Sequence, residues 1–127
     1  RCLREGNDLS IITYGMGVHW VLEYLEENPE VSIDLIDLRC LVPLDTESVY
    51  ESVRKTNRVI VLQEDVMTGG IASDIAALIT EHCFPYLDAP VKRVASLDTP
   101  VPFARELEDG FLAKSRLAQN IESLLAY

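Results

Sequence analysis

Two glycine-containing turns are the residues of this sequence best suited to bind an anion. Gly15-Met16-Gly17 and Thr68-Gly69-Gly70 each follow an apolar stretch and precede a helical pattern. Free backbone N–H groups at the start of a helix can bind phosphate. The first turn lacks the third glycine of GxGxxG, however, and the second lacks the lysine of a P-loop. We therefore expect structural roles for Gly15, Gly17, Gly69 and Gly70, and no cofactor at either turn.

A second group of candidates consists of charged residues that follow an apolar strand pattern. Asp37-Leu38-Arg39 comes directly after this strand, and Pro43-Leu44-Asp45 follows a few residues later. Unpaired charges in a buried loop are costly. We expect Asp37, Arg39 and Asp45 to form a buried or half-buried charge network that fixes the loop. Asp45-Thr46-Glu47 can also cap a helix over 48–56.

Histidine and cysteine side chains offer no recognisable catalytic or metal-binding arrangement. His82 and Cys83 are neighbours in a helical pattern, so their side chains point about 100° apart and do not readily share one metal ion. Cys40 follows Arg39, which could lower the pKa of its thiol, but no histidine lies at a spacing that predicts a base beside it. We expect no catalytic residue and no metal site.

Composition limits the class of protein and its partners. The chain has 127 residues, enough for one domain, and 21 acidic residues against 11 basic ones. The negative charge argues against binding to nucleic acid. No apolar run approaches the roughly 18 residues of a membrane span. Three cysteines without CxxC spacing argue against a disulfide framework and favour a reducing, cytoplasmic location.

Strand and helix patterns alternate along the chain, which predicts an α/β domain with a mainly parallel sheet covered by helices. Strands are expected over 2–4, 9–14, 31–37, 58–63 and 91–97. Helices are expected over 18–28, 48–56 and 114–126, and another follows the turn at 68–70. Prolines at 100 and 102 predict an extended loop before the last helix.

Helical spacing also predicts the buried face of each helix. The helix over 18–28 should bury Val18, Val21, Leu22 and Leu25. The other stripes are Ile71, Ile75, Leu78, Ile79 and His82 in the helix after the second glycine turn, and Leu117, Ile121, Leu124 and Leu125 in the last helix.

Several short motifs, in order and with characteristic spacing, resemble one family: the carboxy-terminal domain of the β subunit of thiamine-dependent 2-oxoacid dehydrogenases, especially the branched-chain (2-oxoisovalerate) type. The resemblance covers almost the whole chain. The motifs are Thr13-Tyr14-Gly15, Asp37-Leu38-Arg39, Pro43-Leu44-Asp45, Ser52-Val53-Arg54-Lys55-Thr56, Thr68-Gly69-Gly70-Ile71-Ala72-Ser73, Leu87-Asp88-Ala89-Pro90-Val91 and Asp98-Thr99-Pro100.

The resemblance implies a three-layer α/β/α domain with a mixed, mainly parallel sheet of about five strands, one of them antiparallel. It implies that residues 1–127 are a fragment of a longer β subunit. In the intact enzyme, thiamine diphosphate and Mg would lie between an α subunit and the amino-terminal domain of β, where a 2-oxoacid is decarboxylated and a lipoyl group acylated. This domain would be inactive alone. It would pack against the α subunit and a second β subunit.

The resemblance also implies one docking site. Asp88 and the terminal carboxylate of Tyr127 would together receive basic residues of the subunit-binding domain of the lipoyl acyltransferase. Lys92 stands near Asp88, where some relatives carry another acid. The alternative is that both carboxylates are simply solvated.

Two other functions remain open. The first is the matching domain of a transketolase or a deoxyxylulose phosphate synthase, which the Leu-Asp-Ala-Pro and Asp-Thr-Pro segments disfavour. The second is an independent domain that binds an anionic ligand at 15–17 or 68–70.

Overall fold

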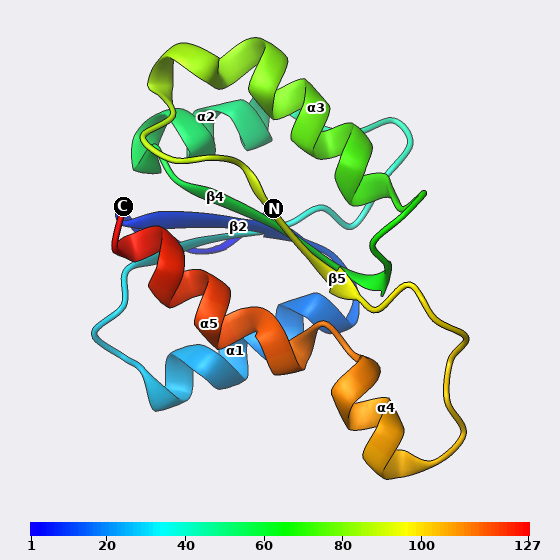
Figure 1. Ribbon diagram of the computed structural model, residues 1–127. Helices are drawn as coiled ribbons and strands as arrows, with labels where there is room; N and C mark the ends of the chain where they lie inside the picture. Colours follow the sequence, from blue (N-terminus) through cyan, green and yellow to red (C-terminus); the bar gives the residue numbers. More distant parts are fainter.

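The computed structural model describes the whole chain, Arg1 to Tyr127, as one five-stranded sheet with helices on both faces (Figure 1). The strand order is β1-β3-β2-β4-β5, and only the β1–β3 pair is antiparallel. The strands are β1 (Cys2–Arg4), β2 (Leu9–Thr13), β3 (Ile33–Asp37), β4 (Val59–Val66) and β5 (Lys92–Ser96). The predicted three-layer domain with a mixed, mainly parallel sheet is confirmed.

Two helices cover each face of the sheet. Helices α2 and α3 pack on one face, and α1 and α5 pack on the other, while α4 lies beyond the end of the sheet (Figure 1). The helices are α1 (Met16–Glu27), α2 (Thr46–Thr56), α3 (Ile71–Cys83), α4 (Arg105–Phe111) and α5 (Lys114–Leu125), with a short 3₁₀ helix η1 (Phe84–Tyr86) after α3. None of these helices combines the length and the apolar composition that a membrane-spanning helix requires.

Alternation along the strands gives the domain two apolar cores. In β2, Ile11 points to the α1/α5 side, where it joins Trp20 and Leu117. Its neighbour Ile12 points to the α2/α3 side, where it joins Val53. Successive side chains of a strand point to opposite faces, so a central strand of such a sheet is buried on both faces and mainly apolar.

The buried faces of two helices differ from the predicted stripes. On α1, Leu22 is exposed and Trp20 is buried in its place. On α3, His82 is exposed, whereas Cys83 is fully buried with Ile75 and Ile79. In both helices the error is one position in the helical phase, because apolar spacing alone does not fix which edge of a stripe faces the sheet.

Two element boundaries also differ from the predictions. Strand β4 continues through Glu64 and Asp65 to Val66, three residues beyond the predicted end. Helix α4 occupies a segment that was expected to be a loop, and only Phe111 of its residues is buried. A short acidic helix with one buried residue has no apolar stripe for periodicity to detect.

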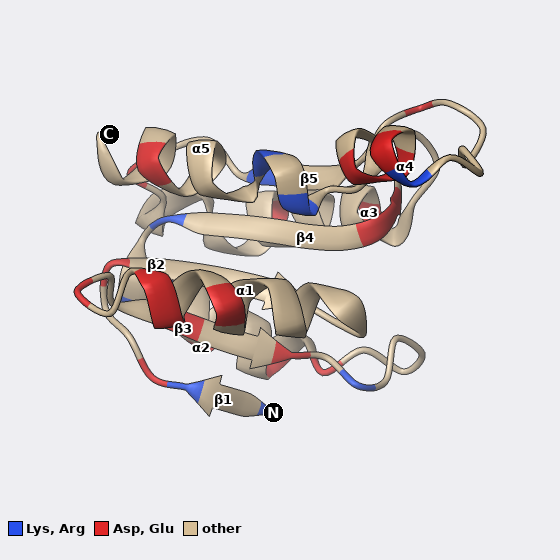
Figure 2. Ribbon diagram, turned by 90° about the horizontal axis from the view of Figure 1, so that it is seen from below, with Lys and Arg blue, Asp and Glu red and all other residues tan.

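The two edges of the sheet carry different parts of the chain. The carboxyl ends of the four parallel strands share one edge, called here the carboxyl edge. Because β1 is antiparallel, it begins at this edge, where the Arg1 amino group donates a 2.8 Å hydrogen bond to the Asp37 carbonyl. The exposed thiols of Cys2 and Cys40 lie near it, whereas Cys83 is buried. The opposite, amino edge carries the ends of α2, α3 and α5 (Figure 1), and Figure 2 shows the chain terminus after α5 on that side.

Candidate functional site

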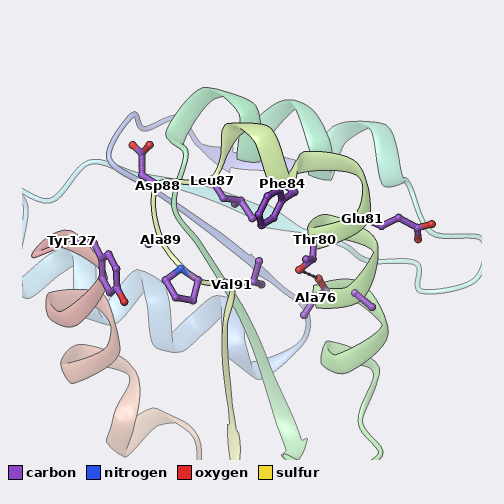
Figure 3. A pocket seen from close by; sticks show the side chains of 11 residues that line it. Ala76, Thr80, Glu81, Phe84, Leu87, Asp88, Ala89, Val91 and Tyr127 are labelled. Carbon is purple, nitrogen blue, oxygen red and sulfur yellow. Dashed lines mark hydrogen bonds between the residues drawn. The ribbon is translucent and has the colours of Figure 1, made fainter.

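The largest surface hollow is an apolar groove at the amino edge, with a volume of about 890 Å³. It lies between α3 and the end of α5, over the segment 87–91 that leads into β5 (Figure 3). Asp88 and Tyr127, the two residues predicted for partner binding, both line it. The structure therefore brings together two residues that are 39 positions apart in the sequence.

The backbone that carries Asp88 is fixed by the end of α2. Asn57 caps this helix in the left-handed conformation, with φ 62°. Its side-chain amide donates a 2.7 Å hydrogen bond to the carbonyl of Tyr86, and its carbonyl accepts a 2.8 Å bond from the Asp88 amide. Asparagine tolerates this conformation better than most residues, which makes it a suitable helix cap here. One residue thus holds both ends of the 86–88 segment.

The turn η1 is held in place by an arginine between two aromatic rings. The guanidinium carbon of Arg54 lies 5.9 Å from the Tyr50 ring centre and 5.8 Å from that of Tyr86. Pro85 restricts the backbone of this turn. With Tyr86 held by Arg54 and Asn57, the preceding Phe84 projects outward and its side chain is 69% exposed.

The groove has an acidic rim and an apolar floor. Asp88 and Glu81 are the charged residues in its lining, and neither has a cationic partner within 4.0 Å. Lys92, close to Asp88 in the sequence, forms no ion pair with it. Figure 3 shows Phe84 and Leu87 between the two carboxylates. Such a lining suits a ligand that combines apolar and cationic groups, as a protein surface does.

The first glycine turn is closely packed and its amides are already bonded. A Cβ added to Gly17 would lie 2.0 Å from the Thr13 hydroxyl oxygen, and Gly15 has φ 57°. The amides of Gly17 and Val18 donate to the carbonyls of Tyr14 and Gly15. The start of α1 therefore presents few free donors to an anion.

The second glycine turn packs against a buried glutamine. Gln63 accepts a 2.8 Å hydrogen bond from the Ala72 amide and donates a 2.6 Å bond to the Val66 carbonyl. A Cβ added to Gly70 would lie 2.0 Å from the Gln63 amide nitrogen, and Gly69 has φ 79°. Gln63 thus takes a donor at the start of α3 that an anion would otherwise use.

The expected network of Asp37, Arg39 and Asp45 is wrong as a network of three. Asp37 contacts Arg39 at 3.6 Å between a carboxylate oxygen and Nε, but Arg39 is largely exposed. Asp45 instead caps α2, accepting hydrogen bonds from the amide and hydroxyl of Ser48. These bonds hold the pKa of Asp45 below its ordinary value. Helix α2 begins at Thr46, two residues earlier than predicted, so Asp45 occupies its N-cap position.

A cluster of hydrogen-bonded groups around one buried aspartate, on the α2 side, was not predicted. Asp34 in β3 is 2% exposed and accepts hydrogen bonds from the Lys55 ammonium, the Ser52 hydroxyl and the Gly6 amide. The bond to Asp34 raises the pKa of Lys55. An aspartate that alternates with isoleucine and leucine in a strand was the available signal, because a buried acid needs a partner. The cluster ties the first loop to β3 and α2.

The five-stranded α/β/α fold defines the class of this domain, and comparison with known sequences identifies its family. Residues 1–116 match the family described as "Transketolase, C-terminal domain", and the chain belongs to this family. Its relatives include β subunits of 2-oxoacid dehydrogenases, which confirms the resemblance seen in the motifs. It is 44% identical over 112 residues to the 2-oxoisovalerate dehydrogenase subunit beta of Bacillus subtilis, covering 86% of this chain and 34% of the relative.

Similar identity extends to relatives with other names. The pyruvate dehydrogenase E1 component subunit beta of Saccharomyces cerevisiae mitochondria is 43% identical over 110 residues, covering 84% of this chain and 30% of the relative. A Bacillus subtilis acetoin:2,6-dichlorophenolindophenol oxidoreductase subunit beta is 41% identical over 111 residues, covering 86% of this chain and 32% of the relative. The chain thus spans about a third of the length of these relatives, and their names differ in substrate.

Solved structures support the fold. The inactive β4 tetramer of a split-gene transketolase has a TM-score of 0.75 at 24% identity, covering 99% of this chain and 41% of that one. The 2-oxoglutarate:ferredoxin oxidoreductase of Magnetococcus marinus has a TM-score of 0.59 at 12% identity, covering 97% of this chain and 18% of that one.

Proposed function

We propose that this domain assembles and docks the decarboxylase component of a 2-oxoacid dehydrogenase complex, of the 2-oxoisovalerate (branched-chain) type, and takes no part in bond breaking. The names of its relatives and the share of their length that it covers support this role. The α subunit and a second β subunit would be its neighbours in the component. The intact enzyme would decarboxylate the 2-oxoacid and acylate a lipoyl group.

Thiamine diphosphate and Mg belong elsewhere in the intact enzyme under this proposal. The two helix starts that could hold a diphosphate have amides bonded to Tyr14, Gly15 and Gln63, so the residues present do not fit that group. We therefore expect no turnover when this domain alone is given thiamine diphosphate, Mg²⁺ and 2-oxoisovalerate. Carbon dioxide release above the enzyme-free rate would contradict this part of the proposal.

The docking partner at the groove is the subunit-binding domain of the lipoyl acyltransferase, with basic side chains near Asp88. One observation carries this proposal: Asp88 and Tyr127 line one apolar groove in which every charged lining residue is acidic. Apolar contact would provide affinity, while the unpaired carboxylates would favour a basic partner and increase the rate of encounter.

Charge reversal at Asp88 tests the docking. In the intact heterotetramer, we expect Asp88→Lys to weaken binding of the isolated subunit-binding domain by about tenfold or more, since loss of one close charge pair at an interface costs at least about 1.4 kcal/mol. Deletion of Tyr127 should weaken it further. The affinity should also depend less on salt. Isothermal titration calorimetry measures all three.

The matched control is Glu26→Lys, which makes the same change of charge on the exposed side of α1. It should leave the affinity near that of the wild type. Unchanged binding of the Asp88→Lys enzyme would show that the groove does not receive this partner.

A further inference from the structure

The carboxyl edge, on the opposite side of the domain from the groove, carries six of the eleven large apolar residues that are exposed in this domain. They come from the start of α1, the loop after β3, and the segment from the end of β5 into α4. Together they are called here the carboxyl-edge patch: Met16, Val42, Leu97, Val101, Phe103 and Leu107. Phe103 is 105% exposed, so it contacts essentially nothing within the domain. Exposed apolar side chains gathered on one face indicate a surface that another protein element covers.

The segment that carries most of the patch is held in a defined position. Asp98 accepts hydrogen bonds of 2.8 and 2.6 Å from the amide and hydroxyl of Thr68. The Leu97 amide donates a 3.1 Å bond to the carbonyl of Phe111. Pro100 and Pro102 restrict the chain between these anchors and Phe103. The apolar side chains are therefore presented by an anchored loop.

The beginning of the chain lies at the same edge. Besides the bond from its amino group, Arg1 accepts a 2.9 Å hydrogen bond from the Asp37 amide, directly before the loop that carries Val42. Any residue that precedes Arg1 must therefore leave the domain at the carboxyl edge. The end of α5 and Tyr127 lie at the other edge, as Figure 2 shows.

Acidic side chains outnumber basic ones around the patch, where Arg39 and Arg105 are the exposed basic residues. Glu64 and Asp65 at the end of β4 are exposed, as are Glu106 and Glu108 in α4. None of these four carboxylates has a cationic partner within 4.0 Å. A second copy of this chain, with net charge −10, would bring like charges together around the patch. The complementary surface is instead apolar with basic side chains.

We infer that the carboxyl-edge patch is the surface on which the preceding domain of the same polypeptide packs, and that this domain meets it with apolar and basic residues. The inference rests on the proposed function, in which this chain is part of a longer β subunit. Relatives about three times as long, in a family described as a C-terminal domain, indicate the length of that preceding part. A domain joined at Arg1 would be present at an effective concentration in the millimolar range, which favours packing at the edge where it is attached.

Hydroxyl-radical footprinting of the longer β polypeptide, without its other subunits, tests the inference by comparing two phenylalanines. Phe103 lies in the patch and Phe84 lies in the groove at the amino edge, with exposures of 105% and 69% in this domain. Their intrinsic reactivity is equal because the side chains are identical. We expect Phe103 to be oxidised at least threefold more slowly than Phe84, which reverses the order of these exposures.

Equal or faster oxidation of Phe103 would overturn the inference. Protection of Phe103 that develops only when the α subunit is added, or only as the polypeptide concentration rises, would also overturn it, because the covering element would then be another chain. The acyltransferase is absent from this experiment. Failure of docking at Asp88 would therefore leave its outcome unchanged, so the two proposals fail separately.

Discussion

The Asp88 amide donates a 2.8 Å hydrogen bond to the carbonyl of Asn57, which connects the rim of the groove to the end of α2. Asn57 is also the residue that ends this helix in the left-handed conformation. The position of the carboxylate that we propose for docking therefore depends on a helix cap that does not itself line the groove.

Substitution of Asn57 should affect stability and docking together. Asn57→Ala places a Cβ in the left-handed conformation and removes the bond to Tyr86, so we expect a loss of about 1–2 kcal/mol in the free energy of unfolding. Docking of the subunit-binding domain should weaken several-fold although no charge changes. Asn57→Gly is the control, because it permits the backbone conformation and removes only the side chain. Urea unfolding and calorimetry should place it between the wild type and Asn57→Ala; an Ala variant that matches the wild type would contradict the role of the cap.

Two glycine-to-alanine substitutions should have opposite effects. In Gly70→Ala the new methyl group collides with the buried amide of Gln63 and disturbs its hydrogen bonds. We therefore expect the free energy of unfolding to fall by about 1–3 kcal/mol. Gly110→Ala is the control. Its Cβ would meet nothing within 4 Å in helix α4, so it should stabilise the protein by up to about 1 kcal/mol. Urea unfolding of both variants checks the sign, and a neutral Gly70→Ala would show that Gln63 can move freely.

Removal of the ammonium group beside Asp34 should destabilise the fold in a pH-dependent manner. For Lys55→Met we expect the free energy of unfolding at neutral pH to fall by about 1–2 kcal/mol. The value is low for the loss of a partner of a buried acid because the Lys55 side chain is 40% exposed and solvent screens the pair. The folded protein raises the pKa of Lys55, so its stabilising contribution is present below the ordinary value of 10.5 and is lost as the pH rises beyond that value. The stabilities of variant and wild type should therefore converge in strong base.

Lys114→Met is the matched control for this comparison. Lys114 pairs with Glu23 where both side chains are about half exposed, so the change should be much smaller. Equal losses in the two variants would show that the burial of Asp34 does not matter. Chemical unfolding over a range of pH provides both measurements.

Removal of the Thr68 hydroxyl should loosen the anchored loop at the carboxyl edge. Hydrogen bonds from the Thr68 hydroxyl and amide lower the pKa of Asp98, so their stabilising contribution is present above the ordinary value of 3.8 and is lost as the pH falls through the folded pKa. We expect Thr68→Val to raise the pKa of Asp98 and lower the melting temperature at neutral pH. The difference in melting temperature should vanish in acid.

NMR titration of the Asp98 carboxyl carbon measures the pKa directly. Thr99→Val is the control, because the Thr99 side chain makes no hydrogen bond within the protein although it adjoins Asp98. An unchanged pKa of Asp98 in Thr68→Val would mean that the hydroxyl bond does not form in solution.

Local patterns were sufficient to predict most of the sheet. The alternation from Ile33 to Ile36 and the apolar run from Val59 to Leu62 each predict a strand, and both strands are present. The expectation of one antiparallel strand came from the family resemblance, which did not say which strand it is. The three residues at 2–4 carry too little pattern to choose a neighbour.

The groove was predictable only in part. The resemblance pointed to Asp88 and Tyr127, but Glu81 and Phe84 were missed because their position depends on the phase of α3, in which the prediction was wrong by one position. A signal for Phe84 was present: a large apolar residue beside Pro85, outside the predicted stripe. The predicted charge network was wrong because Asp45 could bond either to Arg39 or to the start of the next helix. It bonds to Ser48 in that helix, which is nearer in the sequence.

The distribution of the three thiols offers a practical consequence. Cys2 and Cys40 are accessible near the carboxyl edge, whereas Cys83 is enclosed between α3 and the sheet. A maleimide dye should therefore mark one side of the native molecule and leave the acidic groove bare. Fluorescence of the labelled protein would report on binding at the carboxyl edge, and the dye would not obstruct a partner that binds in the groove.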